Sequence, residues 1–129
     1  MAISKKNRLT IFNKYNGKCG YTGKSLEDDW QIDHITPISH YMYYLFTSDY
    51  NDINNLIPTN KIINHYKRDK DLESFRKYMI TFNKRLAKLP KKTMIEKTRK
   101  RKLYMEKIAD YFDITIEKPF DGIFYFEKL

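Results

Sequence analysis

Asp33 and the adjacent His34, together with Asn55 and Asn64, are residue types that could hydrolyse a phosphodiester. Asn55 follows the histidine by 21 residues, and Asn64 comes nine residues later. Such a reaction needs a hard oxygen ligand for Mg²⁺, a base that deprotonates water, and a group that keeps the base correctly turned. One carboxylate, one imidazole and two amides supply these parts, so the set predicts a one-metal phosphodiesterase site.

Three elements are needed to bring these residues together. The pattern predicts a strand over residues 30–36 that Pro37 ends, a second short strand over 53–58, and a helix from 59 to about 68. The aspartate and the histidine would lie on the first strand. One asparagine would enter the second strand and the other would lie on the helix, so we expect a ββα unit over about residues 30–68.

Further helices are expected on both sides of this unit. The first covers residues 4–15, with Ser4 as its cap and Asn16-Gly17 as its stop, and a turn comes next over 18–24, where Gly20 and Gly23 would adopt backbone angles barred to other residues. Residues 38–52 are expected to form a loop.

Helical spacing of apolar residues continues beyond the ββα unit. It predicts one helix over about 71–89 and another over 93–112, the latter with Thr93 and Glu96 as a capping box. Alternation in 114–116 and 123–126 then predicts a small C-terminal hairpin.

The net charge of +9 is unevenly distributed along the chain. Residues 1–18 carry +5 and residues 59–107 carry +12, whereas residues 19–58 carry −5 and residues 108–129 carry −3. Basic parts that bind a polyanion, with an acidic part that holds a metal between them, would give this arrangement. No apolar run approaches the roughly 20 residues of a transmembrane span, so no membrane is expected as a partner.

Cysteine use and the start of the chain indicate a compartment. Cys19 is the single cysteine, which excludes an intramolecular disulfide and a zinc site built on several cysteines. The opening residues 1–6 are charged and lack the apolar core of a secretion signal. We therefore expect a cytoplasmic protein, in a bacterium or a phage-infected host cell.

With these residues in view, the chain resembles the HNH endonucleases, a family with His, Asn and a second His or Asn on a ββα-metal fold. The matching segments are Cys19-Gly20-Tyr21-Thr22-Gly23-Lys24, Ile32-Asp33-His34-Ile35-Thr36-Pro37, Asn55-Leu56-Ile57-Pro58 and Asn64-His65-Tyr66-Lys67. The likeness covers roughly residues 10–80, and Leu72-Glu73-Ser74-Phe75-Arg76 is similar to the segment after the motif in small stand-alone members of the phage type.

The resemblance implies a role for each residue of the opening set. Asp33 and Asn64 would hold one divalent cation, with Mg²⁺ favoured and Mn²⁺ as the alternative. His34 would be the general base, and Asn55 would fix its ring through a hydrogen bond or a backbone contact. Many relatives bind a structural zinc through two Cys-x-x-Cys pairs, which this chain lacks, so no structural zinc is expected.

Two positions keep a competitor. His65 competes with Asn64 as the second metal ligand, because other members of the family use histidine there, and Asn54 competes with Asn55. In the loop, His40 is not expected to be a ligand, although it could contact the substrate.

Candidate contacts to nucleic acid come from two basic groups. Lys61, Lys67 and Arg68 belong to the expected ββα helix, while Arg99 and Arg101 belong to a run of four cations over 99–102. Four consecutive side chains cannot face one way on a helix, so two at most would contact one backbone. The loop aromatics could stack on exposed bases, although packing within the loop is favoured; they are Tyr41, Tyr43, Tyr44 and Phe46.

We therefore expect one α+β domain over residues 1–129. It would combine a ββα-metal (HNH, His-Me finger) core at about 30–68, a basic helical extension at about 71–112 and a C-terminal hairpin at about 114–127. The expected activity is hydrolysis of DNA, with a homodimer if both strands are cut. A catalytically inactive DNA-binding protein on the same scaffold and an RNase are the alternatives.

Overall fold

The computed structural model describes residues 3–37 and 51–129, which form helices and one antiparallel pair of strands. Two compact units divide the chain: Met1–Phe75 with Phe124–Leu129 form unit 1, and Arg76–Ile123 form unit 2. The mixed α and β content agrees with the expected α+β class. Among the described residues, no helix is long and apolar enough to cross a bilayer.

The sheet of unit 1 pairs β1 (Gln31–His34) with β2 (Leu56–Thr59), with Asp33 opposite Ile57. Pro58 is tolerated in β2 because its carbonyl accepts a hydrogen bond from Gly20 N at 2.8 Å, on the edge away from β1. A residue in an antiparallel strand points its N–H and C=O to the same side, so the N–H that proline lacks would not have served β1.

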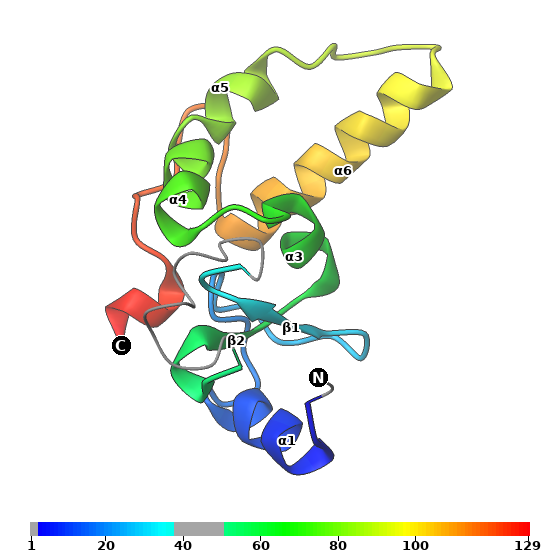
Figure 1. Ribbon diagram of the computed structural model, residues 1–129. Helices are drawn as coiled ribbons and strands as arrows, with labels where there is room; N and C mark the ends of the chain where they lie inside the picture. Colours follow the sequence, from blue (N-terminus) through cyan, green and yellow to red (C-terminus); the bar gives the residue numbers. More distant parts are fainter. Residues whose placement is uncertain (1–2, 38–50) are drawn as a thin grey trace. The chain divides into compact units, whose positions relative to one another are not determined.

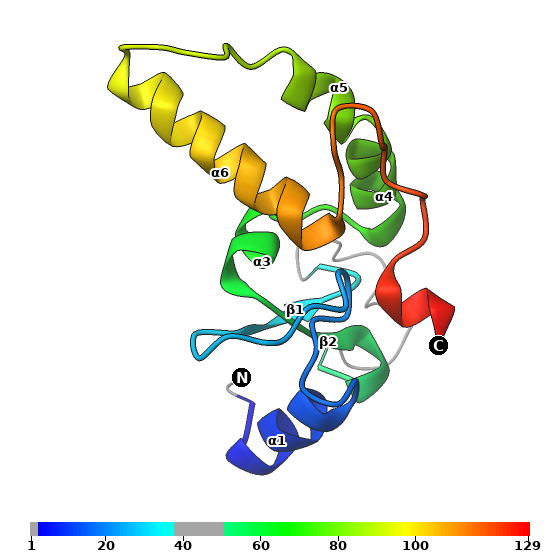
Figure 2. The same ribbon diagram turned by 180° about the vertical axis from the view of Figure 1, so that it is seen from behind.

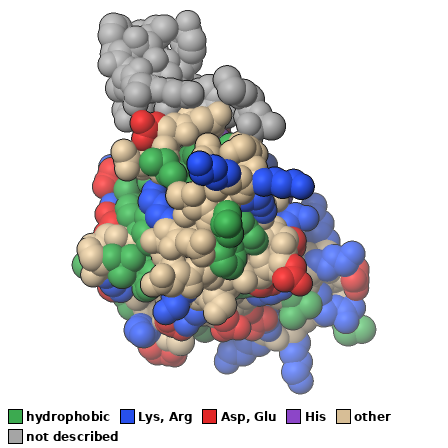
Figure 3. Space-filling view, turned by 90° about the horizontal axis from the view of Figure 1, so that it is seen from below, with side chains coloured by type: hydrophobic (Ala, Val, Ile, Leu, Met, Phe, Trp, Pro, Cys, Tyr) green, Lys and Arg blue, Asp and Glu red, His purple; other side chains and the backbone are tan. Residues whose placement is uncertain are grey.

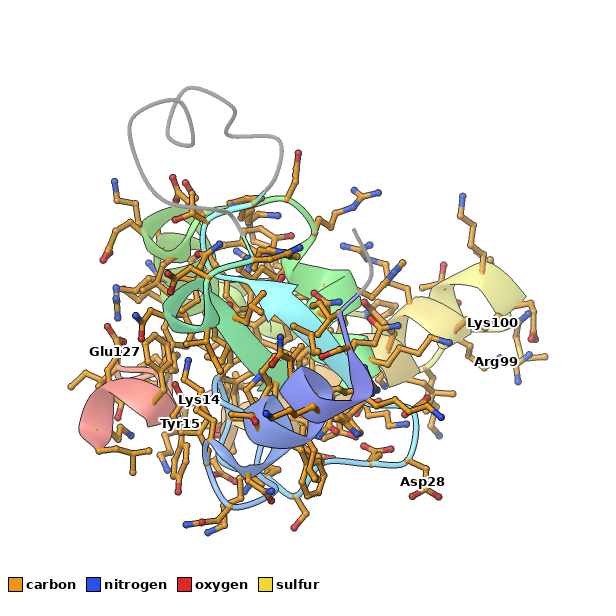
Figure 4. All side chains as sticks on the ribbon, turned by 60° about the horizontal axis from the view of Figure 1, so that its bottom comes forward. Lys14, Tyr15, Asp28, Arg99, Lys100 and Glu127 are labelled. Atoms are coloured by element: carbon orange, nitrogen blue, oxygen red, sulfur yellow. The ribbon has the colours of Figure 1, made fainter. Side chains whose placement is uncertain are left out.

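Helices α1 (Lys5–Asn13) and α3 (Lys61–Lys67) lie on opposite sides of the strand pair (Figures 1 and 2). The predicted cap of α1 is confirmed, since Ser4 Oγ accepts a hydrogen bond from Asn7 N at 3.2 Å. Just after α1, Lys14 Nζ donates to the carbonyls of Ile53 and Leu56 at 3.0 and 2.8 Å, which fastens the end of this helix to the start of β2 (Figure 4).

An aromatic cluster fills the core of unit 1 around Tyr21. Its ring meets Phe75 and Phe124 edge-on at centroid distances of 5.5 and 5.3 Å, and these two phenylalanines stack on each other at 5.4 Å. Phe75 is the last residue before unit 2 and Phe124 is the first after it. The two residues that flank unit 2 in the sequence are therefore in contact inside unit 1.

Unit 2 consists of α4 (Leu72–Ile80) from Arg76 onward, α5 (Phe82–Ala87), α6 (Glu96–Phe112) and the segment after α6. Arg76 Nη1 donates to the carbonyl of Gly122 at 2.6 Å, so the first and last turns of the unit are joined. Its buried side chains are Met79, Phe82, Met105, Ile108, Ala109, Ile114 and Phe120.

Several predicted elements have different bounds in the structure. The first strand, predicted over 30–36, covers only Gln31–His34. The second strand begins at Leu56, and Ile53–Asn55 form a 3₁₀ turn, η1. The helix predicted over 71–89 is broken at Thr81, because the Thr81 hydroxyl and Arg85 Nη2 both donate to the carbonyl of Tyr78, at 3.2 and 2.6 Å. Such side-chain bonds compete with the helical ladder.

The predicted capping box at Thr93 is wrong, and α6 begins at Glu96. Thr93 Oγ1 instead accepts a hydrogen bond from Ile95 N at 3.2 Å, which forms a local turn before the helix. Glu96 pairs with Arg99 and Lys100 at 3.4 and 3.9 Å rather than with a cap.

The predicted C-terminal hairpin is also wrong, because neither segment is a strand. Ile114 N donates back to Ala109 O at 2.9 Å and closes the end of α6. Tyr125 N and Phe126 N donate to the carbonyls of Tyr21 and Gly20 at 3.1 and 2.9 Å, so the end of the chain joins the early turn of unit 1 and finishes as a 3₁₀ turn, η2 (Tyr125–Lys128).

Candidate functional site

Asp33 on β1 is a buried carboxylate, with 7% of its surface exposed. Its Oδ2 accepts a hydrogen bond from the Tyr21 hydroxyl at 2.5 Å and lies 3.0 Å from Lys67 Nζ. The Lys67 side chain is fully buried, and its ammonium also donates to the carbonyl of His34 at 3.1 Å. One lysine of α3 therefore holds both residues of the Asp-His pair.

Asn64 and Lys67 reach β1 from the same face of α3, because they are three residues apart on a helix. Asn64 Nδ2 donates to Gln31 Oε1 at 2.7 Å. Gln31 and Asp33 share one side of β1, since side chains alternate along a strand. The predicted metal ligands, Asp33 and Asn64, thus lie on the same side of β1, although no hydrogen bond between described residues joins them.

Each of these two residues keeps one oxygen that could bind a cation. The contacts of Asp33 use Oδ2 and that of Asn64 uses Nδ2, so Oδ1 of both residues accepts no hydrogen bond from the described part of the chain. Carboxylate and amide oxygens are the ligands that Mg²⁺ prefers. Within residues 3–37 and 51–129 no three His, Cys, Asp or Glu cluster as a metal site, so water would have to fill most of the coordination shell, as is usual for Mg²⁺.

The charge of Asp33 is incompletely compensated in the chain alone. Burial raises the pKa of this carboxyl above its ordinary value, although Lys67 and the Tyr21 hydrogen bond act in the opposite direction. A further positive charge near Asp33 would offset this cost of burial, and in this respect the residues fit a divalent cation.

His34 lies next to Asp33 at the end of β1 and, together with Gln31, lines a cavity. The cavity measures about 570 Å³, and its other lining residues are Ile3, Arg8, Asp28, Asp29, Trp30, Ile32 and Asn51. His34 Nε2 lies 2.9 Å from Asn51 Oδ1. An amide oxygen only accepts hydrogen bonds, so Nε2 is the donor in this contact, and Nδ1 would be the basic nitrogen of a neutral ring.

The Arg8 side chain lines one side of the cavity, and two contacts with Trp30 fix its position. The Arg8 guanidinium stacks 4.0 Å from the centroid of the Trp30 ring and donates to the Trp30 carbonyl at 2.9 Å. Asp28 lies on the loop before β1 (Figure 4). The cavity beside His34 therefore combines an imidazole, an aromatic face and charges of both signs.

Asn55 fixes the chain directly after the Asp-His pair. Its Oδ1 accepts a hydrogen bond from Thr36 N at 2.8 Å, its Nδ2 donates to Thr36 O at 3.2 Å, and its own carbonyl accepts from Ile35 N at 2.9 Å. These contacts hold the backbone directly after His34, at Ile35 and Thr36. The side chain of the competing Asn54 is exposed and makes no hydrogen bond with the described residues.

The predicted nucleic-acid contacts fall in different environments. Lys61 and Arg68 are exposed at the two ends of α3, whereas Lys67 is buried in its ion pair with Asp33. Arg99 and Arg101 are exposed on α6, and Figure 4 shows Arg99 and Lys100 projecting from this helix.

Of the remaining predicted positions, one lies on α3 and the others lie in the expected loop. His65, the competitor of Asn64, is exposed on α3. His40 and the loop aromatics Tyr41, Tyr43, Tyr44 and Phe46 lie outside the described residues.

Three residues of the site are not among those predicted from the sequence. Tyr21 falls in a turn bracketed by glycines, Gln31 in a strand where it has no expected role, and Asn51 in the expected loop. A run of amides and carboxylates over 51–55 is a signal for Asn51. Tyr21 lies in the first of the four segments that carry the resemblance, but nothing in the sequence indicates its contact with Asp33, which depends on the fold.

No model of a known protein family matches the chain, and no curated protein matches it.

Proposed function

We propose that the chain is a divalent-cation-dependent endonuclease of the HNH type, which hydrolyses DNA phosphodiesters on a ββα-metal core. One observation carries the proposal: Asp33 and Asn64 lie on the α3 side of β1, each with an Oδ1 that accepts no hydrogen bond from the described residues, and His34 is the next residue after Asp33. The order β1, β2, α3 is that of a ββα unit.

His34 supplies the base in the proposed reaction. A water molecule attacks the phosphorus, His34 Nδ1 takes the proton of that water, and the bond to the 3′ oxygen breaks. Histidine is the side chain that most often serves as a general base. A divalent cation held by Asp33 and Asn64 would supply charge stabilisation on the phosphate and the leaving oxygen.

Three further residues of unit 1 position the proposed base and the first metal ligand. Asn51 holds the ring of His34 at Nε2, and Asn55 holds the peptide groups of Thr36. Lys67 fixes the carbonyl of His34 and the carboxylate of Asp33 together. The base and the first metal ligand are thus oriented by side chains from other elements of unit 1.

Charge supports DNA as the substrate. Unit 2 carries fourteen Lys or Arg against six Asp or Glu, which is a net +8 of the total +9. On the face shown in Figure 3, Lys and Arg side chains are interspersed with Asp and Glu. The four consecutive cations over 99–102 on α6 are a basic cluster that could contact phosphates.

Incubation with supercoiled plasmid and Mg²⁺ tests the proposal. The natural chain should nick or cut the plasmid, and His34→Ala should lose about 10² to 10⁴ in rate while it still binds DNA. Asp33→Asn and Asn64→Ala should abolish the metal-dependent cleavage, whereas His65→Ala should keep most of it.

Other results would overturn the assignment. Binding without cleavage by the natural chain would indicate an inactive DNA-binding protein, and cleavage of RNA in preference to DNA would indicate an RNase. Loss of activity in His65→Ala with activity kept in Asn64→Ala would move the second ligand to the histidine.

A further inference from the structure

We propose that Lys67 is a resident counter-ion of Asp33, and that its ammonium opposes binding of the divalent cation at the same carboxylate. The inference rests on the proposed metal site of the nuclease. It adds a second role for a residue that the proposed reaction uses only for positioning.

The surroundings of the Lys67 ammonium are those of a bound cation. Its Nζ lies 3.0 Å from Asp33 Oδ2 and 3.1 Å from the carbonyl oxygen of His34, and it sits 6.0 Å from the centroid of the Tyr21 ring. A carboxylate, a carbonyl oxygen and an aromatic face all attract positive charge. The side chain is fully buried, so these groups replace water around the charge.

The metal-free chain needs such a counter-ion. A buried carboxylate without a partner is costly, and the Tyr21 hydroxyl contributes only a neutral hydrogen bond. The lysine allows the chain to fold with Asp33 in place before any metal arrives. Removing the ammonium should therefore leave Asp33 buried with its charge uncompensated.

The same charge must act against a divalent cation. Asn64 is one helical turn before Lys67 and faces the same strand, so a cation on Asp33 and Asn64 would share the space between β1 and α3 with the ammonium. Like charges at such short range repel strongly in a partly buried site. By linkage, the free energy by which a bound metal weakens the ion pair of Lys67 equals the free energy by which the lysine charge weakens metal binding. Removal of the lysine charge should therefore strengthen metal binding.

Titration with Mn²⁺, followed by the electron paramagnetic resonance signal of the free ion, tests this without any nuclease assay. Lys67→Met should bind Mn²⁺ more tightly than the natural chain by at least about tenfold. Lys6→Met, which removes an exposed charge on α1, is the matched control and should change the affinity little. Asp33→Asn should abolish the binding in either background.

Thermal unfolding supplies a second measurement in case Lys67→Met folds poorly. Without metal, this variant should melt below the natural chain, and added Mn²⁺ should raise its melting temperature more than that of the natural chain. A variant that stays unfolded at all Mn²⁺ concentrations would show that a divalent cation cannot replace the ammonium, and would overturn the inference.

Equal or weaker Mn²⁺ binding by Lys67→Met, or a change no larger than that of Lys6→Met, would also overturn it. These outcomes are separate from the fate of the proposed function. A chain that binds Mn²⁺ as described but cleaves no nucleic acid would refute the nuclease and leave the antagonism between Lys67 and metal intact.

Discussion

The side chain of Asn55 and the peptide groups of Thr36 form a two-bond clamp, with distances of 2.8 Å to Thr36 N and 3.2 Å to Thr36 O. The clamp joins the end of η1 to the residues just after His34. An amide suits this position because its oxygen accepts and its nitrogen donates hydrogen bonds.

Asn55→Ala should destabilise the chain by about 1 to 3 kcal/mol, because it leaves the donor and the acceptor of Thr36 without their partner. Urea unfolding followed by circular dichroism measures this free energy. Asn54→Ala is the matched control, since that side chain is exposed and unbonded within the described residues. Equal losses in the two variants would contradict the clamp.

Tyr21 should make unfolding sensitive to alkaline pH. Burial, and then the neighbouring Asp33, raise the pKa of its hydroxyl well above the ordinary value. The unfolded chain therefore loses this proton first, near pH 10, so stability should be unaffected below that pH and fall as pH rises toward the folded pKa.

A spectroscopic titration separates Tyr21 from the exposed tyrosines. Tyrosinate absorbance should show one group that ionises only with loss of the near-ultraviolet circular dichroism, and Tyr21→Phe should remove that group. Burial also raises the pKa of Tyr15, so Tyr15→Phe is the variant for comparison. Ionisation of every tyrosine before unfolding would refute the prediction.

Gly20→Ala should be destabilising by about 1 to 3 kcal/mol, as for other overpacked sites. A Cβ at residue 20 would lie 2.3 Å from both Cδ1 and Cγ1 of Ile57, in the core of unit 1. A double-mutant cycle with Ile57→Ala checks the cause, since the alanine at residue 20 should cost less once that side chain is shortened. Purely additive free energies would show that the clash is not responsible.

The cations of α6 should govern the salt dependence of DNA binding. Arg99→Gln and Arg101→Gln should each lower the slope of log affinity against log salt by about 0.9, if each contacts one phosphate. Fluorescence anisotropy with labelled duplex DNA at several salt concentrations measures the slope. Lys118→Gln, which removes an exposed charge in the acidic end of unit 2, should leave it unchanged.

The sequence predicts those features of unit 1 that are determined by residues close by in the chain. The Ser4 cap, the positive φ of 76° at Gly23 and the helix after β2 are confirmed. The prediction that Gly20 adopts a backbone angle barred to other residues is wrong, because its φ is not positive in the structure. The need for glycine there comes from the contact with Ile57, which lies far away in the sequence.

Several of the predictions that failed concern long-range contacts, whereas the capping box at Thr93 failed because of a local turn. Residues 123–126 alternate like a strand, yet Tyr125 and Phe126 bond to the turn at Tyr21 and Gly20 rather than to residues 114–116. The buried Lys67 resembles a surface cation in the sequence, because nothing there shows that Asp33 lies against it. Charge type is visible in a sequence, whereas the partner of a charge is set by the fold.

The stacking of Phe75 on Phe124 has a consequence for how this chain tolerates change. Since the polypeptide departs and returns at one aromatic contact, residues 76–123 are topologically a cassette. Splicing a short glycine turn between these two rings would delete the basic helices without cutting β1, β2 or α3. Insertions or deletions within residues 76–123, which carry most of the net charge, would thus leave the order of β1, β2 and α3 unchanged.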